Sequence, residues 1–403
     1  MPKAINSSHG RIALGAMLAA AWLAASAAPV RAADGTFDLD VIDPLTGNGA
    51  FLGTTQKKII ELTEKAINED GGIHGKKVRF VFHDDQTSPQ VAVQLANEAI
   101  ARNPPVIFGS TISGVCNAMS PLMQNGPVHW CFSPSIRPKP GGYVFTTQIA
   151  SRDQQRALLT YFKARGWKRI ALITTTDASG QDAAMAINAL VKEPEFADVR
   201  IVEQNQFNAS DVSITAQIAR IQAAKPQVII SWATAAAGAT VFRALIQAGI
   251  DLPVAASGSN MTYGQMTEYA SFLPKQLFFG VSAWAAAGDP AIDLPPAVRA
   301  EQKRFFTVIR AAGIHPDASA DIGWDPERLV AAALNQLPEG ATAAQLHDFL
   351  EHYKGYAGID GIYDFTKIPQ RGLGIDNALV VRWDPAKKDW QPVSKLRGIP
   401  IKS

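Results

Sequence analysis

The feature that most constrains the fold is a regular alternation of short apolar runs and amphipathic helical segments, which starts near residue 37. In the first series we expect strands at Phe37–Asp43, Lys77–Phe82, Val106–Phe108 and Val128–Phe132. Each of the first three is followed by apolar residues at helical spacing. Such repeated strand–helix units favour a parallel sheet with helices on both faces.

A second series of the same kind follows a predicted helix at 151–164. Its strands are expected at Arg169–Thr174, Arg200–Gln206, Val228–Trp232 and Val254–Ala256. The sequence therefore predicts an α/β protein with two doubly wound, Rossmann-like lobes.

The rest of the chain indicates how the lobes are joined. A strand at 278–283, three helices between 296 and 353, and short strands near 362–364 and 379–383 follow the second series. We expect the chain to return to the first lobe and to cross between the lobes more than once, which forms a multi-strand hinge. The predicted division is lobe 1 at 33–150, lobe 2 at 151–284, a return to lobe 1 at 285–357, and a hinge crossing with C-terminal strands of lobe 2 at 358–403.

The N-terminus reads as a cleaved signal peptide, residues 1–32. Lys3 and Arg11 precede the apolar stretch Ile12–Val30, and small residues suited to cleavage follow it. The alternative is an uncleaved membrane anchor, because 19 apolar residues are almost enough to span a bilayer. The Ala-rich stretch favours cleavage and a periplasmic protein. A lipid anchor is not expected, because the cleavage site has no cysteine near it.

The charge of the mature chain argues against several classes of partner. Residues 1–32 carry three basic side chains and no acidic ones, so 35 basic side chains face 36 acidic ones in the remainder. A near-neutral protein without a basic cluster is not typical of nucleic-acid binding or membrane-surface binding. The histidines are scattered, so we expect neither a metal site nor a cofactor.

One turn stands out as a candidate binding element. The run Val106–Phe108 ends in Gly109-Ser-Thr-Ile-Ser113, where a helical pattern begins. Backbone N–H groups at the start of a helix have no internal acceptor and favour an anion. We interpret this turn as the site of a ligand carboxylate; the alternative is that Ser113 only caps its helix.

Cys116 and Cys131 are the two cysteines of the chain. The first is expected early in a helix and the second at the end of the next strand, so a disulfide is feasible in an exported protein. Two buried free thiols are the alternative.

Eight segments in order resemble the periplasmic binding proteins of branched-chain amino acid type, the solute receptors of ABC importers. They are Pro44-Leu-Thr-Gly47, Ala50-Phe-Leu-Gly53, Ala66-Ile-Asn-Glu-Asp-Gly-Gly-Ile-His-Gly75, Asp84-Asp-Gln-Thr-Ser-Pro89, Phe108-Gly-Ser-Thr-Ile-Ser113, Phe132-Ser-Pro-Ser135, Ile218-Ala-Arg-Ile-Gln222 and Gln247-Ala-Gly-Ile250. The resemblance implies a type I, two-lobed receptor that closes over its ligand. It also implies permease and ATPase partners, and we expect a monomer.

The resemblance also implies a set of ligand-binding positions. In that family a serine at the Ser113 position and backbone near the Ser135 position hold the ligand carboxylate, and a residue at the Leu52 position packs over the ligand. The full expected set is Leu52, Ser113, Ser135, Ile136, Arg137, Ser151, Thr234, Ala235, Asn260 and Trp284.

This chain departs from the family pattern where the ligand's amino group is normally bound. Ser151 and Gly258 occupy the positions expected to be acidic. A buried ammonium without a compensating charge is unfavourable by several kcal/mol. We therefore expect an organic acid without an amino group, with Arg137 as a further carboxylate partner and Trp284 among the aromatic residues that favour an aromatic body.

Two rival functions stay open on the sequence. An enzyme is disfavoured, because the glycines at 47–53 do not match the dinucleotide-binding spacing and no nucleophile elbow is present. The second rival function is that of an exported sensor or chemoreceptor partner with the same fold and no role in transport. An amino acid receptor of the same family remains the nearest alternative.

Overall fold

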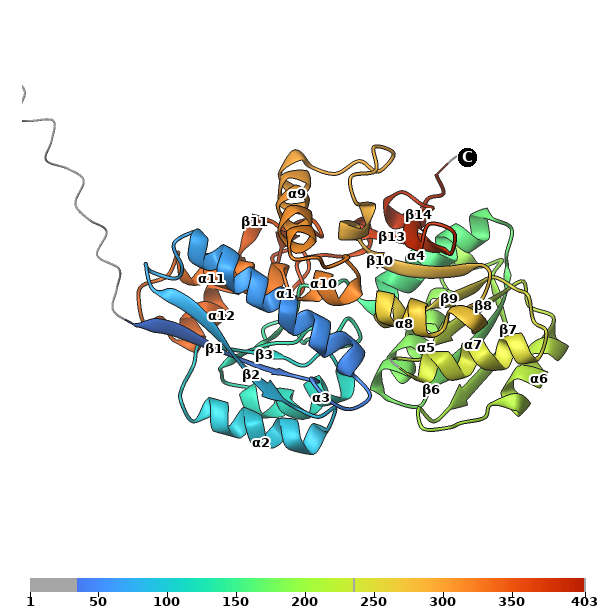
Figure 1. Cartoon of the computed structure of the whole chain (residues 1–403), viewed down its shortest axis with the longest axis horizontal. Coiled ribbons are helices and arrows are strands. Elements are labelled where there is room, and N and C mark those ends of the chain that lie inside the picture. The colour runs from blue at the N-terminus through green and yellow to red at the C-terminus, as the bar shows by residue number, and fades with distance from the viewer. Residues whose placement is uncertain (1–34, 235, 402–403) are drawn as a thin grey trace, which may run out of the picture.

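The computed structural model describes residues 35–234 and 236–401 and contains two α/β lobes side by side along the long axis of the molecule (Figure 1). The predicted signal peptide lies outside the described residues. Within them, no helix combines the length and apolarity needed to cross a membrane.

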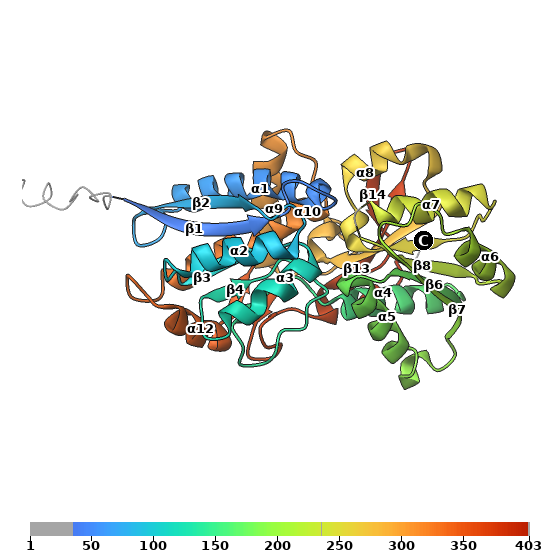
Figure 2. The same cartoon turned by 90° about the horizontal axis from the view of Figure 1, so that it is seen from below.

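The first lobe is built on a five-stranded parallel sheet, which confirms the pattern expected from the first series. Its order across the sheet is β2 (Lys77–Asp84), β1 (Thr36–Asp43), β3 (Val106–Gly109), β4 (Val128–Trp130) and β5 (Val144–Phe145). The helices of this lobe are α1 (Ala50–Glu69), α2 (Pro89–Ile100), α3 (Ser113–Met119), α11 (Asp325–Leu334) and α12 (Ala343–His352). Figure 2 shows the same lobe from below.

Alternating side chains divide these helices between the two faces of the sheet. Ile42 and Ile107 pack with Ala96 of α2 and Val115 of α3. Their neighbours Val41 on β1 and Phe108 on β3 point to the opposite face of the sheet. There they pack in the core that includes residues of α1, α11 and α12.

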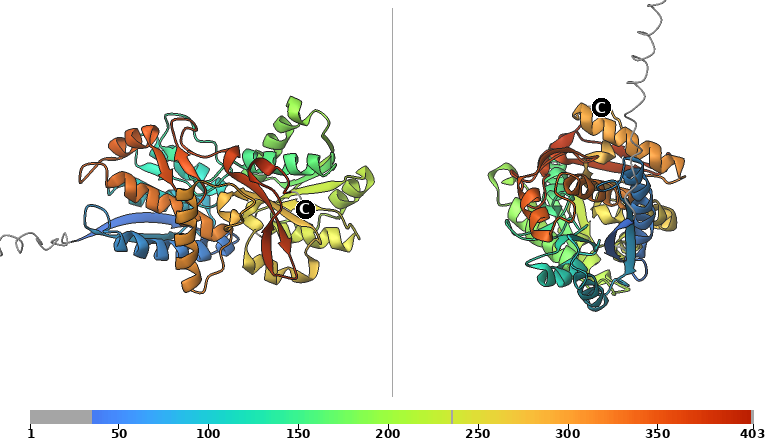
Figure 3. Two further views of the ribbon diagram at one scale, coloured as in Figure 1. Left: turned by 90° about the horizontal axis from the view of Figure 1, so that it is seen from above. Right: turned by 90° about the vertical axis from the view of Figure 1, so that its left-hand side faces the viewer.

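The second lobe repeats this winding. Its seven-stranded sheet has the order β14 (Asp389–Pro392), β13 (Ala378–Asp384), β10 (Leu277–Ser282), β9 (Val254–Ala256), β8 (Val228–Trp232), β6 (Arg169–Thr175) and β7 (Arg200–Phe207). From β7 to β10 the order is that of the first lobe, and β13 and β14 extend it as antiparallel strands (Figure 3). The helices are α4 (Ser151–Ala164), α5 (Ala178–Leu190), α6 (Thr215–Ala224), α7 (Ala237–Gln247) and α8 (Tyr263–Glu268).

Within the described residues the chain passes between the lobes three times, near 146–150, 283–295 and 365–377. After the second passage, α9 (Pro296–Ala311) and α10 (Ala318–Ile322) contact α1 of the first lobe. The hairpin of β11 (Lys354–Ala357) and β12 (Ile362–Asp364) precedes the third passage.

Hydrogen bonds join the first passage to the third. The buried Arg371 guanidinium donates to the carbonyls of Gln148 and Ile136, the latter at 2.8 Å. Thr146 N–H donates to the Gln370 carbonyl at 2.9 Å. Burial lowers the pKa of Arg371 to about 10, against the opposing effect of Asp153 and Asp182, so the side chain stays charged at neutral pH.

Several short elements were not expected. These are β5, α8, α10, β11 and β14. The short helix α10 comes directly before α11, which is one of the three helices expected between 296 and 353. All of the unexpected elements have six residues or fewer, and a pattern of that length does not separate a helix or strand from a loop.

Candidate ligand site in the cleft between the lobes

A small cavity of about 110 Å³ lies between the carboxyl ends of the strands of both sheets. The first lobe contributes the turns after β3 and β4, and the second lobe those after β6, β8 and β9. In doubly wound sheets, ligands bind beyond the carboxyl ends of strands, where the strand order reverses. Its polar lining comprises Thr111, Ser113, Ser133, Ser135, Asp177, Ser179, Thr234, Ser257 and Ser259.

Ser113 and Ser133 form a pair of hydroxyls in this cavity, with 2.7 Å between their Oγ atoms. Ser133 Oγ also accepts from the Ser135 amide at 3.3 Å. When Ser133 donates to Ser113, the hydroxyl proton of Ser113 is left for a ligand. Helix α3 has only seven residues, so its dipole adds little; the hydroxyls and the amides of its first turn are the donors.

Two buried carboxyl groups fix the turn that carries Ser113. Asp43 Oδ1 accepts from the Thr111 amide at 3.0 Å and from its hydroxyl at 2.8 Å. Asp85 Oδ2 accepts from Ser110 Oγ at 2.7 Å. At Gly109 a side chain would approach the Ile42 carbonyl to 1.8 Å at a φ of +111°, so the turn requires glycine.

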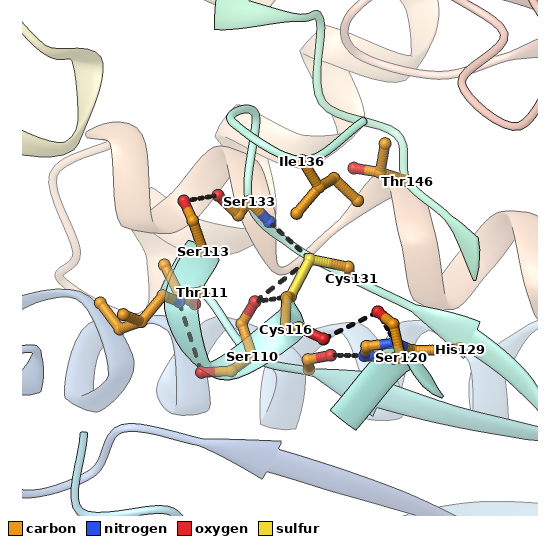
Figure 4. Close-up of a disulfide and its surroundings, with 12 residues drawn as sticks. Ser110, Thr111, Ser113, Cys116, Ser120, His129, Cys131, Ser133, Ile136 and Thr146 are labelled. Carbon is orange, nitrogen blue, oxygen red and sulfur yellow. Dashed lines mark hydrogen bonds between the residues drawn. A yellow bond between two sulfur atoms is a disulfide. The ribbon is translucent and has the colours of Figure 1, made fainter. Parts of the chain in front are cut away.

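The disulfide between Cys116 and Cys131 confirms the predicted pairing (Figure 4). It joins the first turn of α3 to the end of β4, the two segments that bring Ser113 and Ser133 together. Both sulfur atoms are fully buried, with Ile136 packed beside them.

The contact between Ser135 and Ser179 crosses the cleft. Their Oγ atoms lie 3.2 Å apart, and Trp232 Nε1 donates to the Ser179 hydroxyl at 3.2 Å. Thr234 Oγ1 is buried at the same cavity without a hydrogen-bond partner among the described residues. The second lobe thus presents its own hydroxyl groups to the cavity.

A second cavity of about 50 Å³ adjoins the first and shares Thr111, Pro134 and Ser259 with it. Leu52, Val281, Trp284 and Ile322 form its apolar walls. Its polar lining includes Gln148 and Gln154 beside the first passage and Asp321 of α10. Burial raises the pKa of Asp321 to about 7.

The structure brings some of the expected ligand-binding residues together and not others. Ser113, Ser135 and Thr234 line the first cavity, and Leu52 and Trp284 line the second. Ala235 lies outside the described residues. The expected residues that line neither cavity are Ile136, Arg137, Ser151 and Asn260.

Asp182 on α5 accounts for two of those four residues. Its Oδ1 accepts from Arg137 Nε at 2.6 Å, and its Oδ2 accepts from the Ser151 hydroxyl. Arg137 opens onto a different surface depression with Lys139 and Tyr143, while Ile136 packs on the disulfide. Asn260 lies against Gly238 in the second lobe.

Sequence reasoning missed several cavity residues, including Asp177, Ser179, Gln148, Gln154 and Asp321. Asp177 caps α5 by accepting from the Gly180 amide at 2.8 Å, and the residue is part of the lining of the first cavity. An N-cap aspartate just after a predicted strand was a usable signal. Asp321 had none, because it lies far along the chain in a five-residue helix.

His347, Asp348 and Glu351 of α12 have potential metal-ligating atoms within 4.8 Å of one another. They line neither cleft cavity. The His347 ring stacks on Tyr143 at 4.2 Å, and Glu351 accepts from Gln370. These contacts pack α12 against the first lobe.

Comparisons with known proteins agree with this architecture. A model of the periplasmic binding protein family matches residues 40–389. The leucine-, isoleucine-, valine-, threonine- and alanine-binding protein of Pseudomonas aeruginosa is 24% identical over 244 residues, which are 59% of this chain and 64% of that protein. The match therefore spans less than two thirds of that relative.

Solved structures share the fold at low identity. An extracellular ligand-binding receptor from Rhodopseudomonas palustris HaA2 has a TM-score of 0.76 at 19% identity, over 89% of this chain and 100% of that one. An ABC transporter solute binding protein from R. palustris in complex with benzoate has a TM-score of 0.71 at 19% identity, over 92% and 98%. Since the family model spans most of the described residues, the chain belongs to the periplasmic binding protein family.

Proposed function

We propose that this protein is an extracytoplasmic receptor of an ABC importer and that it binds a small carboxylate between its lobes. The observation that carries the proposal is the hydroxyl-lined cavity between strand ends of the two lobes. The Ser113 hydroxyl and the first amides of α3 would hold the carboxylate on one lobe, and the Thr234 hydroxyl would meet it from the other. A membrane permease and its ATPase would then accept the solute.

The second cavity supports an apolar, aromatic body for this ligand. Leu52, Val281, Trp284 and Ile322 would enclose it on several sides. The two cavities of about 110 and 50 Å³ together resemble in size the roughly 150 Å³ engineered cavity that binds benzene in another protein. The benzoate-bound relative is consistent with such a ligand.

An amino acid is the second candidate, and Asp177 is the observation that favours it. Asp177 lines the cavity together with Ser113 and Ser135, and a carboxylate at this position could pair with an ammonium group. The absence of acids at Ser151 and Gly258 therefore argues less strongly against an amino group than the sequence alone suggested. The Pseudomonas relative, named for five amino acids, agrees with this alternative.

A melting-temperature screen distinguishes the two candidates, because a ligand bound only to the folded state raises the apparent stability. The panel contains benzoate and its ring-substituted derivatives, leucine, isoleucine, valine and alkyl acids that lack the amino group. We expect aromatic acids to raise Tm. Stabilisation by leucine with no effect of any aromatic acid would select the amino acid receptor instead.

The position of the carboxylate is tested with Ser113→Ala, which should weaken binding of the stabilising acid by about 1–2 kcal/mol in calorimetric titration. Ser120→Ala is the matched control, since its hydroxyl bonds to the Cys116 carbonyl outside both cleft cavities. Equal affinities of the wild type and Ser113→Ala would place the carboxylate elsewhere.

A further inference from the structure

The second cavity contains buried polar atoms that the bound carboxylate does not explain. Asp321 Oδ1, the side-chain amide nitrogen of Gln148 and the side-chain oxygen of Gln154 have no hydrogen-bond partner among the described residues. All three side chains are at least 95% buried, and all three line this cavity. Leaving a buried polar atom unpaired is unfavourable by about 1–3 kcal/mol, so three at one small cavity point to a group that satisfies them.

Asp321 is the ionisable member of this group, and no cationic side chain is among the groups that face it. The groups that face its carboxyl are Asp360, Gln148 and Ser282, and the carboxyl of Asp325 is also near. Asp360 Oδ1 is already occupied by the Trp284 amide at 3.2 Å. Gln148 faces the same carboxyl without forming a hydrogen bond of acceptable geometry. Asp360, whose pKa is raised well above its usual range by burial, shares its proton with the Asp321 carboxyl, whereas Asp321 Oδ1 forms no hydrogen bond of acceptable geometry and stays open to a donor from a ligand.

Apolar side chains form much of the remaining wall of the cavity, Thr111, Ser259 and Ser282 add hydroxyl groups, and the cavity continues from the proposed carboxylate site. Thr111, Pro134 and Ser259 belong to both cavities, so one compact molecule can occupy the two. Such a pocket, apolar with a few convergent polar groups, is the usual form of a small-molecule site.

We infer that Asp321, supported by Gln148 and Gln154, is a specificity subsite that accepts a hydrogen bond from the end of the ligand opposite its carboxylate. The ligand class is then a small carboxylic acid with a distal donor, either a hydroxyl or an amine. This inference rests on the proposed carboxylate receptor. Acids of the same size without a donor are bound less well, because they leave the Asp321 oxygen unpaired.

The test compares probes that differ only at the distal end. In the aromatic series these are 4-hydroxybenzoate, 4-methoxybenzoate and 4-(aminomethyl)benzoate; in the amino acid series, 5-hydroxynorvaline and norvaline. Calorimetric titration of the wild type should give about tenfold tighter binding of a donor-bearing probe than of its matched partner. The hydroxyl and aminomethyl probes identify which donor is bound.

Asp321→Asn replaces the carboxyl group by an amide of the same shape and should reduce this preference to about threefold or less. The control is Asp317→Asn at the start of the same helix, where the carboxyl accepts from Ser319 and Tyr263 amides and does not line the cavity. Circular dichroism melting curves establish that both variants are folded.

The outcomes separate the inference from the proposed function. If acids bind, and Ser113→Ala weakens them, but no probe pair differs or Asp321→Asn keeps the preference, the Asp321 subsite is wrong and the receptor stands. If no probe of either series binds, the proposed carboxylate receptor fails, and the subsite fails with it.

Discussion

At the scale of single residues, the buried carboxyl groups behind the cleft are the most consequential. Asp43 is almost fully buried, and burial together with the charge of Asp85 raises its pKa to about 8. Its neighbours Asp84 and Glu327 are acidic as well. The group that positions the Thr111 turn is therefore protonated in the folded protein at neutral pH.

This raised pKa predicts how stability depends on pH. Between the ordinary carboxyl pKa of 3.8 and about 8, the folded state holds a proton on Asp43 that the unfolded state has released. The stabilisation is therefore complete below pH 4 and is lost as the pH rises to 8, by at most about 1.4 kcal/mol per pH unit. Asp43→Asn mimics the protonated form, so its unfolding free energy should fall less between pH 5 and 8 in urea titrations.

Asp38 provides the control for that measurement. It is exposed and paired with Arg79, which lowers its pKa, so Asp38→Asn should change the pH dependence only below pH 4. If Asp43→Asn and the wild type lose the same stability between pH 5 and 8, Asp43 is ionised in the folded protein and our account of it is wrong.

At the scale of elements, the passages between the lobes depend on Arg371. From the third passage, its guanidinium donates to the carbonyls of Gln148 in the first passage and of Ile136, both more than 200 residues earlier in the chain. Arg371→Met keeps most of the apolar stem but leaves those carbonyls unpaired, together with the charges of Asp153 and Asp182. We expect it to lower the free energy of unfolding by about 3 kcal/mol in urea titrations.

The exposed Arg79 is the matched control. It pairs with Asp38 on the surface, and Arg79→Met should change stability by less than about 1 kcal/mol. Equal destabilisation by the two substitutions would mean that Arg371 contributes no more than a surface ion pair.

The helices and strands also show how much of the structure could be predicted from the sequence. The alternation of patterns predicted the principal strands of both sheets, because strands buried on two faces carry continuous apolar runs. Ser113 was placed correctly at the cleft since its position follows from one strand–helix turn. Arg137 was placed in the wrong environment, because its partner Asp182 lies 45 residues later and no local pattern links them.

The same limit applies to Asp321. It reaches the cleft only because the chain returns across the hinge and sets α10 against α1. Composition and periodicity describe neighbours along a helix or strand, so they do not report which distant segments meet. The contribution of α10 to the second cavity was therefore beyond prediction, whereas Leu52 and Trp284 of the same cavity were expected from the family resemblance.

At the scale of the whole molecule, the proposed function requires the lobes to move apart to admit a ligand. Ser135 and Ser179 are in contact across the cleft and provide a test. In a Ser135→Cys, Ser179→Cys double variant, oxidation should join the lobes. The oxidised protein should fail to take up a stabilising acid, and reduction with a mild thiol should restore uptake.

Each single-cysteine variant controls for the substitutions themselves, and mass spectrometry establishes the cross-link. Unchanged uptake by the cross-linked protein would show that the ligand enters without separation of the lobes, which contradicts binding by closure. Faster release of the ligand from the cross-linked protein than from the reduced protein would also contradict binding by closure of the lobes.

The disulfide between Cys116 and Cys131 affects how the proposed site would bind its ligand. The disulfide joins the segments that carry Ser113 and Ser133, so this part of the proposed site is formed before a ligand binds. Little conformational entropy of these segments would then be lost on binding. In the proposed receptor, the first lobe would therefore bind the carboxylate first, and the second lobe would close over it. If the protein is the proposed receptor, we expect the reduced protein to bind a carboxylate more weakly than the oxidised one, because the two segments would no longer be joined covalently.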